Sequence, residues 1–172
     1  MWDSETVSVS VTEKAACLWI SGQPTARSRD GREEKSCDFP EEGIRFTSSE
    51  HKKAYYDSLQ KFSAPDSADK ALCYCINLMQ STRSHVTEIF DFEQKCLKTE
   101  CLKAGWQTSS SEKAIRMAFN LFSGEIPTVD YEDKVDNQLK ECQNYTVNEL
   151  FYSSFAPYFW QAVQLRYPEY TK

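Results

Sequence analysis

The sequence predicts an all-α protein, a compact bundle of five to seven helices over residues 43–172. Two observations predict this fold class. Apolar residues recur at helical spacing from residue 47 onward, and three Ser- or Thr-x-x-Glu segments in this part can cap helix N-termini. A third observation separates residues 1–42, whose second half is turn-forming and charged. We expect residues 1–42 to form a poorly ordered N-terminal extension.

The first two helices are expected between residues 47 and 79. Thr47-Ser48-Ser49-Glu50 has the pattern of a capping box, and Tyr55, Leu59 and Phe62 then share one helix face. Pro65-Asp66 is expected to end this helix and begin the next. The apolar stripe of the second helix is Ala68, Ala71, Leu72, Cys75, Ile76 and Met79.

Two weaker segments, at about 82–92 and 97–105, are expected to follow as short helices. Ser109-Ser110-Ser111-Glu112 is a second capping box that opens a strong helix, and Gly124 is placed to end it. The acidic residues 125–145 are expected to form a solvated loop, or a loop with a short helix inside it.

Thr146-Val147-Asn148-Glu149 is the third capping box. The final helix is expected from about Tyr158 to Tyr167, with Pro157 at its start and Pro168 at its end. Because it is apolar nearly all round, we expect this C-terminal helix to be buried near the centre, with Phe159 and Trp160 in the core.

The charge and cysteine content exclude several classes of protein. Of the net charge of −6, the extension carries −4 and residues 43–172 carry −2, so neither part is a basic nucleic-acid-binding surface. No apolar run approaches the ~20 residues of a membrane helix, and there is no basic, apolar signal segment. The seven cysteines are an odd number, which favours free thiols in a reducing cytoplasm. We therefore expect a cytoplasmic protein without a membrane partner.

The cysteine spacing does not favour a metal site. Cys73 and Cys75 lie two residues apart, about 200° around a helix, so their side chains face apart. The spacing of Cys96 and Cys101 also differs from the usual zinc motifs. We expect no metal and no cofactor.

The two histidines offer one catalytic alternative. His85 and Glu88 lie one helical turn apart and could serve a small hydrolase or nuclease as an acid–base pair, although the same spacing is common on helix surfaces. His51 is expected in an exposed first turn beside Lys52 and Lys53.

A basic cluster between Lys95 and Arg116 offers a second alternative. Trp106 and Gln107 lie among its basic residues, and basic side chains around an aromatic ring suit single-stranded nucleic acid. The other interpretation is that Trp106 closes a loop onto the core while the lysines are solvated. The candidate binding residues here are Lys98, Lys103, Trp106, Gln107, Lys113 and Arg116.

The last segment is rich in aromatic residues, and Tyr and Trp often anchor protein interfaces. We expect Tyr158, Arg166 and Tyr170 to be interface residues.

Three stretches resemble an uncharacterised family of small proteins from Firmicutes and their phages or mobile elements, a domain of unknown function. They are residues 49–56, residues 104–108 running into 118–121, and residues 156–160 running into 165–170. The resemblance covers the chain from about residue 43. It implies a bacterial cytoplasm and a mobile-element setting, and it brings no catalytic residues.

Together these observations predict a non-enzymatic protein-binding module of phage or mobile-element origin that acts on a host protein. The most specific form of this hypothesis is that the protein inhibits a host defence nuclease, such as a CRISPR effector, in the way that anti-CRISPR proteins do. The alternatives are a small hydrolase or nuclease that uses His85 and Glu88, and direct nucleic-acid binding through the Lys95–Arg116 cluster.

Overall fold

The computed structural model describes residues 43–127 and 135–171, and the predicted N-terminal extension lies outside them. The described residues form eight α-helices, which confirms the all-α class. Three of these helices are single turns, and they take the number above the predicted five to seven. The helices are α2 (Ser49–Leu59), α3 (Ser67–Ile76), α4 (Gln80–Ser84), α5 (Val86–Ile89), α6 (Ser109–Ser123), α7 (Val135–Gln143), α8 (Val147–Phe151) and α9 (Ala156–Arg166).

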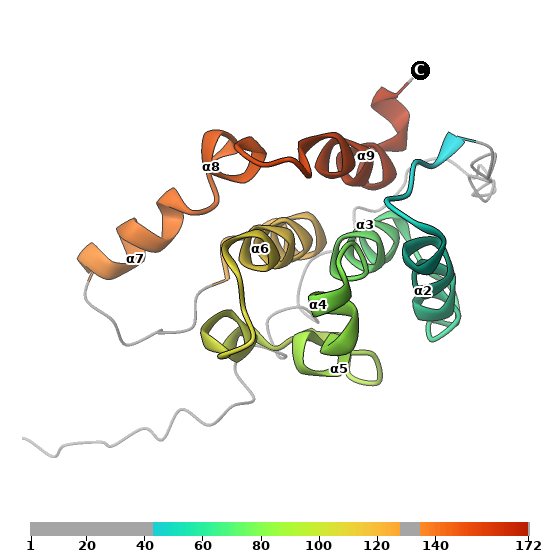
Figure 1. Ribbon diagram of the computed structural model, residues 1–172, viewed down its shortest axis with the longest axis horizontal. Coiled ribbons are helices and arrows are strands. Elements are labelled where there is room, and N and C mark those ends of the chain that lie inside the picture. Colours follow the sequence, from blue (N-terminus) through green and yellow to red (C-terminus); the bar gives the residue numbers. More distant parts are fainter. Residues whose placement is uncertain (1–42, 128–134, 172) are drawn as a thin grey trace, which may run out of the picture.

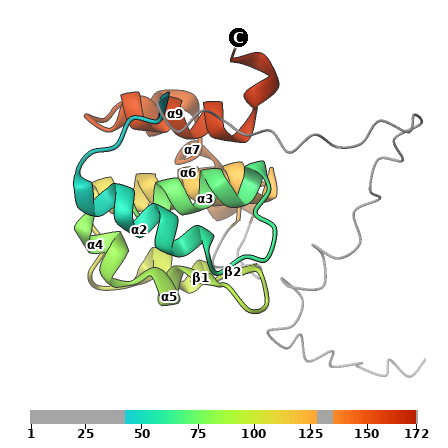
Figure 2. The same cartoon turned by 90° about the vertical axis from the view of Figure 1, so that its right-hand side faces the viewer.

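The helices are arranged in layers (Figure 2). Helices α2, α3 and α6 form the middle layer, α9 lies over it, and α4, α5 and a small hairpin lie beneath it. Helices α7 and α8 extend beyond α6 on one side (Figure 1). No helix among the described residues is long and apolar enough to span a bilayer.

Helix α3 is the centre of the core. Every residue from Ala71 to Ile76 is fully buried, and α3 packs against α2, α6 and α9. Helix α9 is buried along one face only, through Phe159, Ala162 and Leu165. The prediction that Trp160 is a core residue is wrong, because 57% of its surface is exposed.

The predicted helix starts are close to the observed ones. The N-cap of α2 is Ser48, one residue after the expected Thr47, and its hydroxyl accepts from the His51 amide. The capping box of α6 is formed by Thr108 and Ser111, one residue before the expected Ser109 and Glu112. Thr146 caps α8 as predicted, and its hydroxyl accepts from the Glu149 amide.

The expected helix over residues 82–92 is broken into α4, α5 and the strand β1 (Phe90–Asp91). This strand pairs antiparallel with β2 (Cys96–Leu97). The Asp91 side chain accepts hydrogen bonds from two backbone amides of the turn, and Lys95 adopts a left-handed conformation with φ of 51°. Local side-chain bonds of this kind compete with helix formation. The next segment forms η2 (Thr99–Lys103), a 3-10 helix.

Candidate functional site

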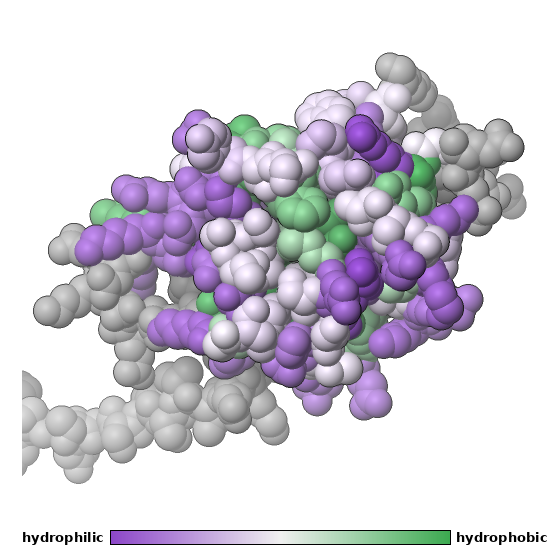
Figure 3. All heavy atoms as spheres, viewed as in Figure 1, coloured by the Kyte–Doolittle hydropathy of each residue, from purple (hydrophilic) through white to green (hydrophobic). Residues whose placement is uncertain are grey.

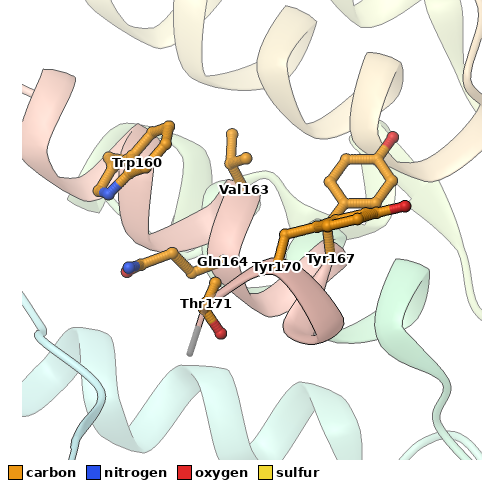
Figure 4. Close-up of a pocket in the computed structure, with 6 residues that line it drawn as sticks. All are labelled: Trp160, Val163, Gln164, Tyr167, Tyr170 and Thr171. Atoms are coloured by element: carbon orange, nitrogen blue, oxygen red, sulfur yellow. The ribbon is translucent and has the colours of Figure 1, made fainter.

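Helix α9 and the 3-10 helix η3 (Pro168–Tyr170) form a surface that we call the C-terminal aromatic hollow. Three aromatic residues dominate it: Trp160 is 57% exposed, Tyr167 38% and Tyr170 82%. The hollow has a volume of about 260 Å³. Its lining residues are Trp160, Val163, Gln164, Tyr167, Tyr170 and Thr171 (Figure 4).

The sequence explains why these side chains meet. Trp160, Gln164 and Tyr167 follow i, i+4, i+7 spacing, so they share one face of α9. Pro168 cannot continue the helix hydrogen bonding, and the chain turns into η3. Figure 4 shows Trp160 on one side of Val163, with Tyr167 and the η3 residue Tyr170 together on the other side.

Arg166 fixes the C-terminal end of α9. Its Nε donates to the carbonyl of Leu121 at 2.7 Å, and its Nη1 donates to the hydroxyl of Ser67 at 3.1 Å. The guanidinium also lies 5.0 Å from the centroid of the Tyr167 ring. The structure thus ties Arg166, an expected interface residue, to α6 and α3, where it positions one aromatic wall of the hollow.

The other two expected interface residues lie in different places. Tyr170 lines the hollow. Tyr158 is half-buried on another side of α9, where the guanidinium of Arg45 lies 5.2 Å from its ring centroid. The backbone amide of Arg45 also donates to the Gln161 side chain at 3.1 Å, so this side of α9 is covered by the segment before α2.

None of the six lining side chains is charged at neutral pH. The hollow offers aromatic faces, together with hydrogen-bond donors from an indole, an amide and hydroxyl groups. It holds no pair of groups suited to acid–base work. Its chemistry is that of a binding site for an uncharged, partly apolar group.

On the face shown in Figure 3, apolar residues gather between α9 and the ends of α3 and α6, and hydrophilic residues surround them.

The structure brings His85, Glu88 and Trp106 together, although the sequence suggested two separate sites. The indole of Trp106 stacks on the imidazole of His85, and its Nε1 donates to Oε2 of Glu88 at 3.0 Å. Nδ1 of His85 donates to the carbonyl of Ser81 at 2.8 Å, which leaves Nε2 with the lone pair. Trp106 is partly buried against the core, in agreement with the loop-closing interpretation.

Most members of the predicted basic cluster contact carboxylates. Lys98 pairs with Asp91 at 3.6 Å, and Lys113 pairs with Glu149 at 2.9 Å. Arg116 is nearly buried and pairs with both Glu112 and Glu141. Lys95 pairs with Asp69 at 3.2 Å. These contacts reduce the positive charge that the cluster can offer to a phosphate backbone.

Gln107 and Lys103 complete the cluster. The Gln107 amide donates to the Cys101 carbonyl at 2.8 Å, and its oxygen accepts from the Ser111 hydroxyl. Gln107 therefore joins η2 to the start of α6. Lys103 is exposed at the end of η2.

His51 is fully buried, and its predicted exposure is wrong. Its Nε2 donates to the Tyr74 carbonyl at 3.0 Å, and its Nδ1 accepts from the Thr47 amide at 3.3 Å. Burial lowers the pKa of His51 to about 4, and the positive charge of Arg83 acts in the same direction. His51 is thus a neutral core residue that fastens the segment before α2.

The five described cysteines are free thiols, as predicted. Burial raises the pKa of the Cys101 thiol to about 12, and it raises the pKa values of Cys73 and Cys75 as well. These buried thiols are therefore poor nucleophiles. Within the described ranges, no three His, Cys, Asp or Glu residues are grouped so that they could hold a metal ion.

The sequence pattern did not reveal Trp160 and Tyr167 as surface residues. The available signal was the polar residue Gln164 between them on the same helical face, followed by Pro168. An apolar helix with one polar position on a face is easily read as wholly buried.

Comparison with known proteins assigns the chain to a family but gives it no activity. No curated protein and no solved structure matches the chain. The model of a family of unknown function, DUF6075, matches residues 41–172. This match begins two residues before the first described residue and includes the whole helical domain with its aromatic hollow. The chain therefore belongs to the DUF6075 family of unknown function.

Proposed function

We propose that this protein is a non-enzymatic protein-binding module that presents the C-terminal aromatic hollow to its partner. The observation that carries the proposal is the exposure of Trp160, Tyr167 and Tyr170 around one hollow. Large aromatic side chains are enriched among the residues that dominate binding energy at protein interfaces. Their exposure to water is unfavourable in the free protein and is relieved when a partner covers them.

The sharper version of the proposal concerns the partner. The sequence resemblance favours a phage or mobile-element protein that acts in a bacterial cytoplasm on a host protein. An inhibitor of a host defence nuclease, comparable to anti-CRISPR proteins, fits the net charge of −6. An acidic protein is attracted to the positively charged channel that such a nuclease uses for nucleic acid.

The test is affinity capture from a Firmicutes lysate with the full-length tagged chain, with and without nuclease treatment. We expect a stoichiometric protein partner that survives nuclease and is lost with the double variant Trp160→Ala/Tyr170→Ala. The matched control is Val147→Ala/Tyr152→Ala, which removes two side chains that are 74% and 83% exposed outside the hollow. Equal capture by both double variants would contradict the assignment of the hollow.

A second candidate function is acid–base catalysis at His85. It is favoured by the hydrogen bond to the Ser81 carbonyl, which orients the ring and leaves Nε2 able to accept a proton. A small nuclease or hydrolase of this kind should lose activity by about 10²–10⁴-fold in His85→Ala and Glu88→Ala. Hydrolysis of single- and double-stranded nucleic acids is the assay, and no cleavage by the wild-type chain would argue against this function.

Direct nucleic-acid binding is tested by a gel shift. Binding through Lys98, Lys103 and Trp106 should weaken steeply as salt is added. The ion pairs of Lys98, Lys113 and Arg116 favour the opposite result, which is no shift at low salt.

A further inference from the structure

We propose that the C-terminal aromatic hollow recognises a proline-rich segment in the polyproline II conformation, with a basic residue beside the prolines. This inference rests on the proposed function, because it names the chemistry of the partner at the same hollow. Three independent features support it: the spacing of the aromatic walls, the donors between them and the charge at the rim.

The spacing of the walls matches the repeat of the ligand. Trp160 lies in α9 and Tyr167 is the C-cap of this helix, seven residues later, which corresponds to about 10.5 Å along the helix axis between their backbone positions. A polyproline II helix repeats every three residues, over about 9.3 Å. The backbone positions of Trp160 and Tyr167 are thus separated by nearly the repeat of the ligand, and on this basis we place one proline against Trp160 and another, three positions away, against the Tyr167–Tyr170 wall. Val163 lies between the two walls (Figure 4).

The donors match the unpaired groups of the ligand. A polyproline II helix makes no internal hydrogen bonds, so its carbonyl oxygens remain available. The indole N–H of Trp160, the amide of Gln164 and the hydroxyl of Thr171 can donate to them. Known proline-recognition domains likewise use aromatic-lined grooves, and they benefit from the low entropy of the preformed ligand. A nucleic-acid strand would need cations, and the lining side chains include none.

Next to Tyr170 the chain carries the carboxylate of Glu169, which suits a basic residue of the ligand. Glu169 lies in η3 between Tyr167 and Tyr170, it is exposed, and no ion pair within the described part of the chain engages it. The nearest basic residue in sequence, Arg166, is bonded to Leu121 and Ser67 on the inner side of α9. Among the described residues Glu169 thus has no basic partner, and its exposed carboxylate can attract a lysine or arginine that flanks the prolines.

The experiment is isothermal titration of the full-length chain with a capped twelve-residue peptide that contains Pro-Ala-Ala-Pro and one flanking arginine. We expect saturable one-to-one binding. Replacing both prolines by alanine removes both stacked contacts and should weaken binding at least about tenfold. Trp160→Ala removes one of these contacts and should also weaken binding about tenfold. Glu169→Gln should weaken binding of the arginine peptide by about two- to fivefold, while a peptide with neutral flanks should be unaffected.

Tyr152→Ala is the control, since this tyrosine is an exposed aromatic residue outside the hollow, and the variant should bind the peptide normally. Circular dichroism checks that each variant keeps its helices.

Three results would overturn the inference. The first is absence of saturable binding up to about 1 mM peptide, and the second is equal binding of the alanine peptide. The third is self-association of the wild-type chain that is lost in Trp160→Ala, which would make a second copy the occupant. Hollow-dependent capture of a protein, combined with no peptide binding, would refute proline recognition and leave the proposed function intact.

Discussion

The indole of Trp106 lies flat against the imidazole of His85, with 4.2 Å between the ring centroids and 9° between the ring planes. The same indole donates its Nε1–H to Glu88. The residue that the sequence suggested for stacking a base is therefore already stacked on a histidine. This arrangement joins the loop after η2 to α4 and α5.

We expect Trp106→Phe to lower the free energy of unfolding by about 0.5–1 kcal/mol, because the ring can still stack while the bond to Glu88 is lost. Trp106→Ala should lower it by about 2 kcal/mol, since the stack is lost as well. Urea unfolding followed by circular dichroism measures both. Unchanged stability of Trp106→Ala would show that the stack does not hold the loop.

The burial of His51 predicts an acid-sensitive fold. Its pKa is about 4 in the folded protein and about 6.5 in the unfolded chain, so the unfolded state binds more protons between these values. The stabilisation is fully present above pH 6.5 and is lost as the pH falls towards 4. The resulting decrease in the free energy of unfolding between pH 7 and pH 4 is about 3 kcal/mol at most.

The measurement is chemical unfolding from pH 7 to pH 4, compared with His51→Gln, whose amide can donate to the Tyr74 carbonyl but does not titrate. We expect a smaller loss of stability with acid in the variant than in the wild type. Parallel pH profiles for the two proteins would be evidence against this role of His51.

Arg116 links α6 to α7, because its Nε contacts Glu141 at 2.9 Å while its Nη1 contacts Glu112 of its own helix. We expect Arg116→Ala to raise amide hydrogen exchange in residues 138–143 by about tenfold, since it leaves Glu141 without this partner. Exchange in α3 should change far less. Glu112→Gln is the control that keeps the contact between the helices, and it should leave α7 protected.

Gly124 ends α6 in a left-handed conformation with φ of 72°. The space around its Cα is open, so an alanine there would meet no steric clash, only an unfavourable backbone conformation. We expect Gly124→Ala to lower the free energy of unfolding by about 1 kcal/mol. Gly105→Ala, which is equally open, should change it by less; equal losses would point to a cause other than φ.

The aromatic residues of the hollow should contribute little to folding. Because Trp160 and Tyr170 are largely exposed, we expect Trp160→Ala and Tyr170→Ala to change stability by about 0.5 kcal/mol or less. Thermal unfolding measures this directly. A loss comparable to that of a core substitution such as Phe159→Ala, about 3–5 kcal/mol, would contradict the surface assignment.

Part of the fold follows from local sequence rules. The stop of α6 at Gly124, the cap of α8 at Thr146 and the end of α9 before Pro168 each depend on one residue and its immediate neighbours. The all-α class follows in the same way, because helical periodicity is a short-range property. The one-residue shift at Ser48 marks the precision of such rules, since adjacent hydroxyl residues can serve the same cap.

The sequence by itself therefore determined the all-α class, the longer helices and their approximate ends, but not the break of residues 82–92 into α4, α5 and β1. Only the tertiary structure decided that α3 rather than α9 is central, that His51 is buried and that Trp160 is exposed. Burial depends on which elements cover a side chain, and those elements lie far away in sequence. Tyr and Trp leave this choice open, because their rings are stable in a core and also effective at a surface. The hollow exists because no described element covers that face of α9.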